Sequence, residues 1–183
     1  NQKQKTDQKY NIIAIGAGLG KQKGFDRLIE SFKYIDNKKI TLAIIGDGNG
    51  REKLELQIRN NRLEDRVFLV GFQKDPLKFY KNSNVLACSS YYEGFPNVFL
   101  EAGLCGLPVV SFDIKGGISE IINPSLNGFI VPDGNIKEFA ATLLKAINYP
   151  FNKRVIKNHI LTNFNMEKII SEYEELFENV LDK

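Results

Sequence analysis

The sequence has no tryptophan, a single histidine and only two cysteines in its 183 residues. Cys88 and Cys105 lie in apolar surroundings without the C-x-x-C spacing of a zinc site, so we expect no metal and a reducing compartment. His159 stands between Asn158 and Ile160 near the C-terminus, where a surface or packing role is expected. The sequence therefore gives no support for a Ser-His-Asp or Cys-His nucleophile.

A strong charge of either sign and a long apolar run are also lacking. Lysine and arginine total 25 against 22 acidic residues, a balance of +3 that is too weak to indicate nucleic acid. No apolar run approaches the ~18 residues that a membrane-spanning helix needs, and the polar N-terminus does not resemble a signal peptide. We expect a folded cytoplasmic protein, either free or peripheral at the cytoplasmic face of the membrane, with no nucleic-acid partner.

Short β-rich runs alternate with amphipathic stretches along most of the chain. The strands are predicted at 11–16, 40–46, 66–70, 85–88, 109–112 and 128–131. A first helix is indicated by the spacing of Phe25, Leu28, Ile29, Phe32 and Ile35, and further helices are expected at 50–60, 76–82, 96–105, 118–123, 136–148 and 151–164. This alternation predicts an α/β fold: a Rossmann-like, doubly wound parallel sheet of about six strands flanked by helices.

The length suits one domain, which we place at residues 10–164. Residues 1–9 are polar and are expected to be a linker or a disordered start. Residues 165–183 form a predicted amphipathic helix that either closes the core of this domain, packs against a neighbouring domain or mediates self-association. Its apolar stripe consists of Met166, Ile169, Ile170, Tyr173, Phe177, Val180 and Leu181.

The loop after the first strand, residues 16–24, is rich in glycine and lysine. Glycines allow a phosphate to approach the backbone, and lysine with helix N-terminal amides attracts it. Lys21 breaks a dinucleotide G-x-G-x-x-G pattern, while Gln22 and Ile15 break a P-loop pattern. An anion site and a flexible turn with solvated lysines both remain open for this loop.

The segment after the fourth strand contains two carboxylates, Glu93 before a predicted helix and Glu101 within it. Glu101 falls about 40° from Cys105 on the helix, at the edge of the buried face, where a carboxylate is costly unless something binds it. Between the two acids, the free amides of Asn97, Val98 and Phe99 suit a diphosphate. A helix with a capping acid and a surface glutamate remains the alternative.

The loop after the fifth strand offers a further turn into a helix. Gly116 and Gly117 come just before Ser119 there. This turn either binds an anion or is a plain turn that Ser119 caps.

These motifs together resemble the C-terminal, donor-binding half of a retaining GT-B glycosyltransferase of family 4. The resemblance covers residues 11–147 and is strong because the motifs occur together in the family's order. They are KGFD at 23–26 with LIE at 28–30, IGDG at 45–48, VGF at 70–72, EGFPNVFLEA at 93–102, GLPVV at 106–110 and NG at 127–128.

The resemblance implies a UDP- or GDP-sugar donor and a glycan or lipid-linked acceptor. Glu93, the catalytic candidate, would meet a hydroxyl of the transferred sugar, and Glu101 would receive the ribose hydroxyls. Lys23 would neutralise the diphosphate. The remaining donor-side positions are Gly18, Phe72 near the base, Gly94 and Phe95 at the sugar, and Asn97 and Val98 at the diphosphate. No metal or other cofactor is implied.

Two departures from the family pattern qualify this assignment. Gly18 stands where the family usually has an arginine that clamps the diphosphate. An acceptor-binding N-terminal domain does not fit within 183 residues, so we expect a fragment that binds but does not transfer. The alternatives are a GT-B-fold nucleotide-sugar epimerase domain, a non-catalytic nucleotide-binding module and an oxidoreductase domain.

Overall fold

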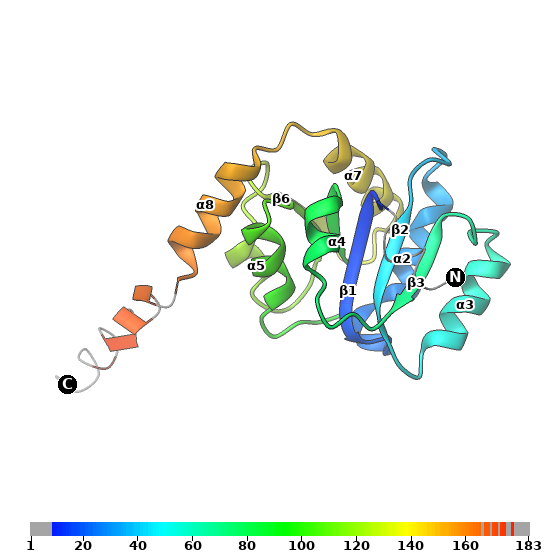
Figure 1. Cartoon of the computed structure of the whole chain (residues 1–183), viewed down its shortest axis with the longest axis horizontal. Helices are drawn as coiled ribbons and strands as arrows, with labels where there is room; N and C mark the ends of the chain where they lie inside the picture. The colour runs from blue at the N-terminus through cyan, green and yellow to red at the C-terminus, as the bar shows by residue number, and fades with distance from the viewer. Residues whose placement is uncertain (1–8, 166, 169, 172, 175–176, 178–183) are drawn as a thin grey trace.

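The computed structural model describes residues 9–165, 167–168, 170–171, 173–174 and 177. Its centre is one parallel sheet in the order β3-β2-β1-β4-β5-β6, which confirms the predicted Rossmann-like architecture (Figure 1). The strands are β1 (Ile12–Gly18), β2 (Leu42–Asp47), β3 (Val67–Gly71), β4 (Val85–Cys88), β5 (Val109–Asp113) and β6 (Gly128–Pro132). Most strand residues are buried, as expected for a sheet that is covered on both faces.

Helices and short 3-10 turns connect these strands. They are η1 (Lys21–Lys23), α2 (Phe25–Ser31), η2 (Phe32–Tyr34), α3 (Arg51–Asn60), α4 (Leu77–Asn82), α5 (Asn97–Leu104) and α6 (Ile118–Ile121), and α7 (Ile136–Asn148) and α8 (Lys153–Asn163) follow the last strand. The predicted first helix ends earlier than expected, because residues 32–34 tighten into η2. The helix predicted at 118–123 is shorter too, since Ile122 leaves helical geometry.

The order of the strands reverses at β1, and this reversal divides the helices between the two faces. Right-handed crossovers place α2 and α3 on one face and α4, α5 and α6 on the other. The contacts agree: α2 packs against α3 and α7, and α8 packs against α5. The crevice beyond the carboxyl ends of β1 and β4 is therefore the topological switch point, where ligands of such folds bind.

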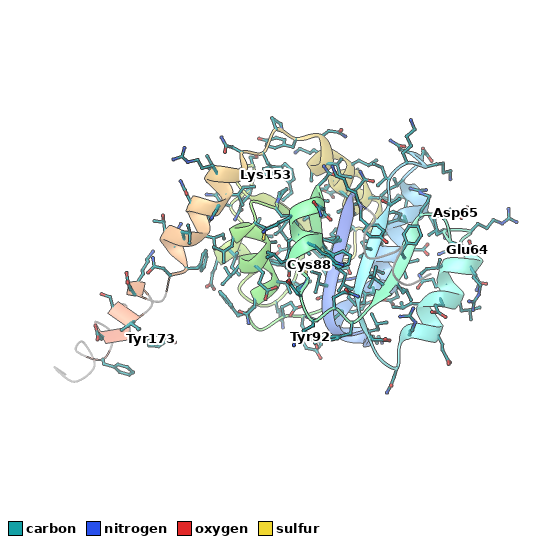
Figure 2. The ribbon with its side chains drawn as sticks, viewed as in Figure 1. Glu64, Asp65, Cys88, Tyr92, Lys153 and Tyr173 are labelled. Atoms are coloured by element: carbon teal, nitrogen blue, oxygen red, sulfur yellow. The ribbon has the colours of Figure 1, made fainter. Side chains whose placement is uncertain are left out.

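The predicted C-terminal helix is only partly described. Its described residues extend away from the domain in Figure 1, and Ile170, Tyr173 and Phe177 are about half exposed or more. Tyr173 lies far from the sheet residue Cys88 in Figure 2. These three side chains thus do not close the domain's own core. Met166, Ile169, Val180, Leu181 and residues 1–8 of the predicted linker lie outside the described residues.

Within the described part of the chain, none of the helices combines the length and the apolar character required to span a bilayer.

Candidate functional site

The first wall of the site is the connection between β1 and α2. β1 continues to Gly18, two residues further than predicted. The glycine loop is therefore shorter than expected and consists of residues 19–20, which are followed by η1. Gly24 has a φ of 58°, and a Cβ there would lie 1.9 Å from the Ser89 carbonyl oxygen. Only glycine therefore lets this connection approach the segment after β4 so closely.

Lys23 and Glu93 meet across that approach. The Nζ of Lys23 lies 2.8 Å from Oε1 of Glu93, and the two side chains are 22% and 9% exposed. The hydroxyl of Ser90 donates to the same carboxylate oxygen at 2.5 Å. The sequence placed Lys23 and Glu93 separately at a ligand, and the structure brings them into direct contact with each other.

Gly94 and Phe95, which follow Glu93, are both exposed. No atom lies within 4 Å of a Cβ built on Gly94, so its backbone is open to a ligand. Phe95 is 45% exposed, and its ring centroid lies 6.4 Å from that of Phe164 at the end of α8. Gly94 therefore leaves open space beside the Glu93 carboxylate, and Phe95 adds an exposed ring.

The loop after β5 forms backbone hydrogen bonds with this segment. The amide of Glu93 donates to the Lys115 carbonyl, and the amide of Gly117 donates to the Gly94 carbonyl. Gly116 has a φ of 120°, and a Cβ there would lie 1.9 Å from the Glu93 carbonyl oxygen. The two glycines predicted as an anion turn thus act in packing. The N-cap of α6 is Gly117 without a side-chain cap, so the alternative of capping by Ser119 is wrong.

The N-terminus of α5 offers fewer free amides than the sequence suggested. Pro96 is the N-cap and the helix begins at Asn97. The Asn97 amide donates to the Phe95 carbonyl and the Phe99 amide to the Pro96 carbonyl, so the expectation that both are free is wrong. Among the described residues the Val98 amide has no hydrogen-bond partner. Val98 is therefore the amide that remains for an anion.

Glu101 lies on α5 and is exposed rather than at a buried edge. Its carboxylate accepts a hydrogen bond of 2.6 Å from the buried hydroxyl of Tyr80 on α4. Burial, and secondly this bond to Glu101, raise the pKa of Tyr80. Tyr80 holds one carboxylate oxygen and leaves an exposed acceptor for a ligand.

Gly18 and Phe72 lie at the ends of the strands on the other side of the crevice. Gly18 pairs with Asp47 in the ladder between β1 and β2, and the nearest atom to a Cβ on Gly18 is the Asp47 carbonyl oxygen at 3.8 Å. Phe72 follows β3 and is 68% exposed. Both positions have room for a ligand or a larger side chain.

Sequence reasoning missed two residues that hold this site together, Tyr80 and Arg27. Arg27 on α2 is 7% exposed and contacts the segment after β4. A single arginine among helical apolar residues gives no signal of burial. The pairing of Tyr80 with Glu101 likewise depends on how α4 packs beside α5.

The remaining titratable groups do not form a metal site or a nucleophilic centre in the described part of the chain. In the part of the chain that the structure describes, no three histidine, cysteine or acidic side chains gather as metal ligands would. His159 is half-buried on α8, with Nδ1 3.1 Å from the Asn163 side-chain nitrogen and its ring against Phe164. Burial raises the pKa of the Cys88 thiol, so this cysteine is an unreactive core residue.

Comparisons with known proteins show the family of the chain. The family model "Glycosyl transferases group 1" matches residues 1–161. The amylovoran biosynthesis glycosyltransferase AmsD of Erwinia amylovora is 35% identical over 136 residues, 74% of this chain and 38% of that protein. Poly(ribitol-phosphate) α-N-acetylglucosaminyltransferase of Staphylococcus aureus is 30% identical over 162 residues, 85% of this chain and 33% of that protein.

Solved structures give the same result. The lipopolysaccharide outer core galactosyltransferase WaaB superimposes with a TM-score of 0.82 at 27% identity, over 94% of this chain and 50% of that one. A mutant of TarM from S. aureus, solved with UDP, superimposes with a TM-score of 0.81 at 28% identity, over 92% of this chain and 35% of that one.

This chain spans about a third to a half of the length of these relatives. The family model nevertheless covers most of the chain, and the sheet that carries the crevice is shared with solved glycosyltransferases. The chain therefore belongs to the family of glycosyl transferases group 1.

Proposed function

We propose that this chain is the donor-binding domain of a retaining GT-B glycosyltransferase of family 4. It binds a UDP- or GDP-sugar, and the enzyme transfers the sugar to a glycan or lipid-linked acceptor in polysaccharide or glycoconjugate synthesis. The observation that carries the proposal is the contact of Lys23 with Glu93 at the switch point of the sheet. A cation and a hydroxyl acceptor stand there side by side, as a sugar diphosphate requires.

Each part of the donor has a matching group in the proposed complex. Lys23 turns from Glu93 to the diphosphate, which the free Val98 amide also meets at the start of α5. Glu93 then accepts from a sugar hydroxyl, and the backbone of Gly94 and Phe95 approaches the same sugar. The exposed oxygen of Glu101 receives the ribose hydroxyls.

The remaining donor contacts lie around this centre. Asn97 lies next to the diphosphate and Phe72 near the base, while Gly18 leaves the diphosphate without a second cation. Lys23 and the N-terminal dipole of α5 neutralise the leaving diphosphate, so no metal is required.

The acceptor is proposed to bind to a second domain across the crevice, because the site residues named here form only one wall. The described C-terminal residues Ile170, Tyr173 and Phe177 are proposed to pack on such a domain or on a second copy of this chain. On its own, this chain binds donor weakly and does not transfer sugar.

Calorimetric titration tests the donor assignment. The wild-type chain is expected to bind UDP or GDP, and the matching UDP- or GDP-glucose, galactose or N-acetylglucosamine more tightly. Glu93→Gln is expected to lose about tenfold in affinity for the nucleotide sugar relative to the free nucleotide, because the charged acceptor of the sugar hydroxyl is removed, whereas the loss of the ion pair with Lys23 affects both ligands alike.

Glu64→Gln is the matched control, since it removes the same charge from an exposed position after α3 (Figure 2). The absence of nucleotide binding at millimolar concentration, or equal losses for nucleotide and nucleotide sugar in Glu93→Gln, would contradict the proposal.

A further inference from the structure

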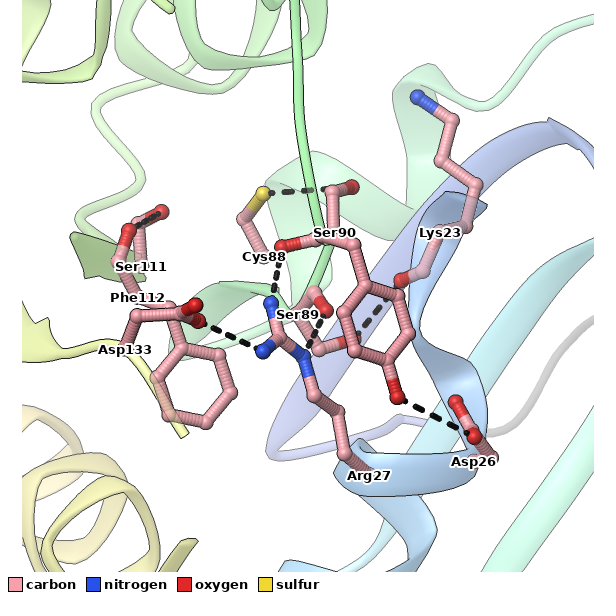
Figure 3. Close-up of polar contacts among 10 residues, drawn as sticks. Lys23, Asp26, Arg27, Cys88, Ser89, Ser90, Ser111, Phe112 and Asp133 are labelled. Atoms are coloured by element: carbon pink, nitrogen blue, oxygen red, sulfur yellow. Dashed lines mark hydrogen bonds and ion pairs between the residues drawn. The ribbon is translucent and has the colours of Figure 1, made fainter. Parts of the chain in front are cut away.

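Arg27 is a buried cation at the candidate site, and its whole guanidinium group is engaged. Nε donates to the Ser89 carbonyl at 2.5 Å, and a second nitrogen donates to the Ser90 carbonyl. The third lies 2.6 Å from Oδ1 of Asp133, in the loop after β6 (Figure 3). One side chain from α2 thus joins the segments that follow β4 and β6.

The guanidinium is also stacked between two aromatic rings. Its central carbon lies 4.2 Å from the ring centroid of Tyr91 and 4.2 Å from that of Phe112. A planar, delocalised cation satisfies two carbonyls in one plane and two ring faces at once, which a lysine ammonium cannot do. The site therefore requires arginine specifically, and not only a positive charge.

The two carbonyls that Arg27 binds belong to Ser89 and Ser90, and the hydroxyls of these serines form hydrogen bonds with Lys23 and Glu93. The Ser90 hydroxyl donates to the Glu93 carboxylate, and the Ser89 hydroxyl donates to the Lys23 carbonyl at 3.0 Å. Ser89 and Ser90 are 1% and 2% exposed, so water cannot replace the guanidinium at their carbonyls. The Ser90 hydroxyl therefore links the backbone that Arg27 fixes to the Glu93 carboxylate itself, whereas the Ser89 hydroxyl reaches only the backbone of Lys23 and not its ammonium group.

We propose that Arg27 is a positioning residue that holds the Glu93 carboxylate in place for the sugar, acting through the Ser89 and Ser90 backbone and the Ser90 hydroxyl. This inference rests on the proposed function, because Glu93 is its last link. It predicts that Arg27 governs the gain in affinity that the sugar adds to the nucleotide, because the carboxylate that Arg27 positions meets the sugar, whereas the Lys23 ammonium and the Val98 amide meet the diphosphate.

The chain contains a matched control for this role, Arg66. Arg66 is 5% exposed, donates to the Ile35 carbonyl at 3.0 Å and to the Ile40 carbonyl at 3.3 Å, and lies over the Phe32 ring. It comes just before β3, at the opposite end of the sheet. Arg66→Lys therefore disturbs a similar buried arginine without touching the segment after β4.

The experiment compares Arg27→Lys, Ser90→Ala and Arg66→Lys with the wild-type chain. Two quantities are measured: the ratio of the Kd for UDP to that for UDP-glucose, UDP-galactose or UDP-N-acetylglucosamine, or of their GDP counterparts, and the hydrogen exchange rates of the Tyr91 and Glu93 amides. These amides donate to the Gln22 and Lys115 carbonyls and report the order of the segment without any ligand.

Arg27→Lys and Ser90→Ala are each expected to lower the affinity ratio about fivefold while the Kd for the nucleotide changes less than about twofold. Their double variant is expected to lose no more than the larger single loss, since both act along one path. Arg27→Lys also raises the two exchange rates by about tenfold relative to Arg66→Lys. If Arg27→Lys does not fold, Ser90→Ala alone decides.

An unchanged affinity ratio in Arg27→Lys, an equal effect of Arg66→Lys, or additive losses in the double variant would overturn the proposal. A wild-type chain that binds no nucleotide would instead contradict the proposed function. The amide exchange rates then decide the role of Arg27 alone, and rates equal to those of Arg66→Lys would refute it.

Discussion

Each end of the sheet has a buried arginine that binds backbone carbonyls, but only one of the two lies beside the candidate site. At the amino end, the guanidinium of Arg66 donates to the Ile35 and Ile40 carbonyls in the connection between η2 and β2. At the carboxyl end, Arg27 holds carbonyls of a segment whose next residues are exposed and carry Glu93. A buried arginine that clamps backbone is therefore not a functional signal by itself. What matters is whether the clamped backbone leads to groups that a ligand can reach.

The largest expected effects concern two glycines, one at each end. Gly116, beside Glu93, has a φ of 120°, and Gly106, before β5, has a φ of 69° with a Cβ position 2.8 Å from the Lys153 carbonyl oxygen. Either change to alanine adds backbone strain to a crowded contact, so each should lower the free energy of unfolding by about 2–5 kcal/mol. Chemical denaturation measures both.

The two glycine variants are expected to differ in their affinity for the nucleotide sugar. Gly116→Ala must move the Glu93 carbonyl and is expected to weaken nucleotide-sugar binding, whereas Gly106→Ala leaves the site intact. Equal Kd values for the two folded variants would remove the distinction between the two ends.

A second prediction concerns the departure at Gly18. The space around its Cβ position is open, so Gly18→Arg restores a cation at the diphosphate and should raise the affinity for UDP or GDP about tenfold, the value of one charge-assisted hydrogen bond. Gly20→Arg adds the same charge at another open position two residues away. An equal gain in both variants, measured by calorimetry, would mean that net charge alone is responsible.

The smallest effect at neutral pH is expected for the two buried tyrosines. Burial raises the pKa of Tyr10 to about 12, and burial together with Glu101 raises that of Tyr80. Because the folded pKa exceeds the unfolded value of about 10, the stabilising contribution is complete below pH 10 and is lost as the pH rises above it. Wild-type stability should fall by up to about 1.4 kcal/mol per pH unit for each tyrosine there.

Tyr80→Phe should flatten that alkaline decline and, at neutral pH, cost about 1 kcal/mol of stability and weaken UDP or GDP binding slightly, since Glu101 loses its partner. Tyr10→Phe should flatten the decline without any change in nucleotide affinity. Unfolding curves between pH 7 and 12 distinguish these outcomes, and a Tyr80→Phe curve parallel to wild type would contradict the pKa shift.

The sequence predicted the sheet well, because strands such as Leu42–Asp47, which is buried up to its last residue, read as nearly continuous apolar runs. It also placed Lys23 and Glu93 at the same edge, since the carboxyl ends of parallel strands meet there. It did not predict their direct contact, which depends on the close approach at Gly24. Local periodicity carries no information about such contacts between distant segments.

Arg27 shows most clearly why the other contacts of the site could not be predicted from the sequence. On a helix it lies about 200° from Phe25, on the side that periodicity assigns to solvent. It is buried because the segments after β4 and β6 cover it. The prediction of free amides at Asn97 and Phe99 was wrong for a related reason, because both amides donate to carbonyls of the turn at Pro96.

The most direct test of the donor site is the titration of wild type and Glu101→Gln with UDP or GDP, whichever binds, and with pyrophosphate. If Glu101 receives the ribose hydroxyls, the variant should lose about 1.5–3 kcal/mol of binding free energy for the nucleotide, nearly none for pyrophosphate, and little in Tm. Equal losses for both ligands, or a large drop in Tm with unchanged nucleotide affinity, would make Glu101 a structural partner of Tyr80 and contradict the donor site.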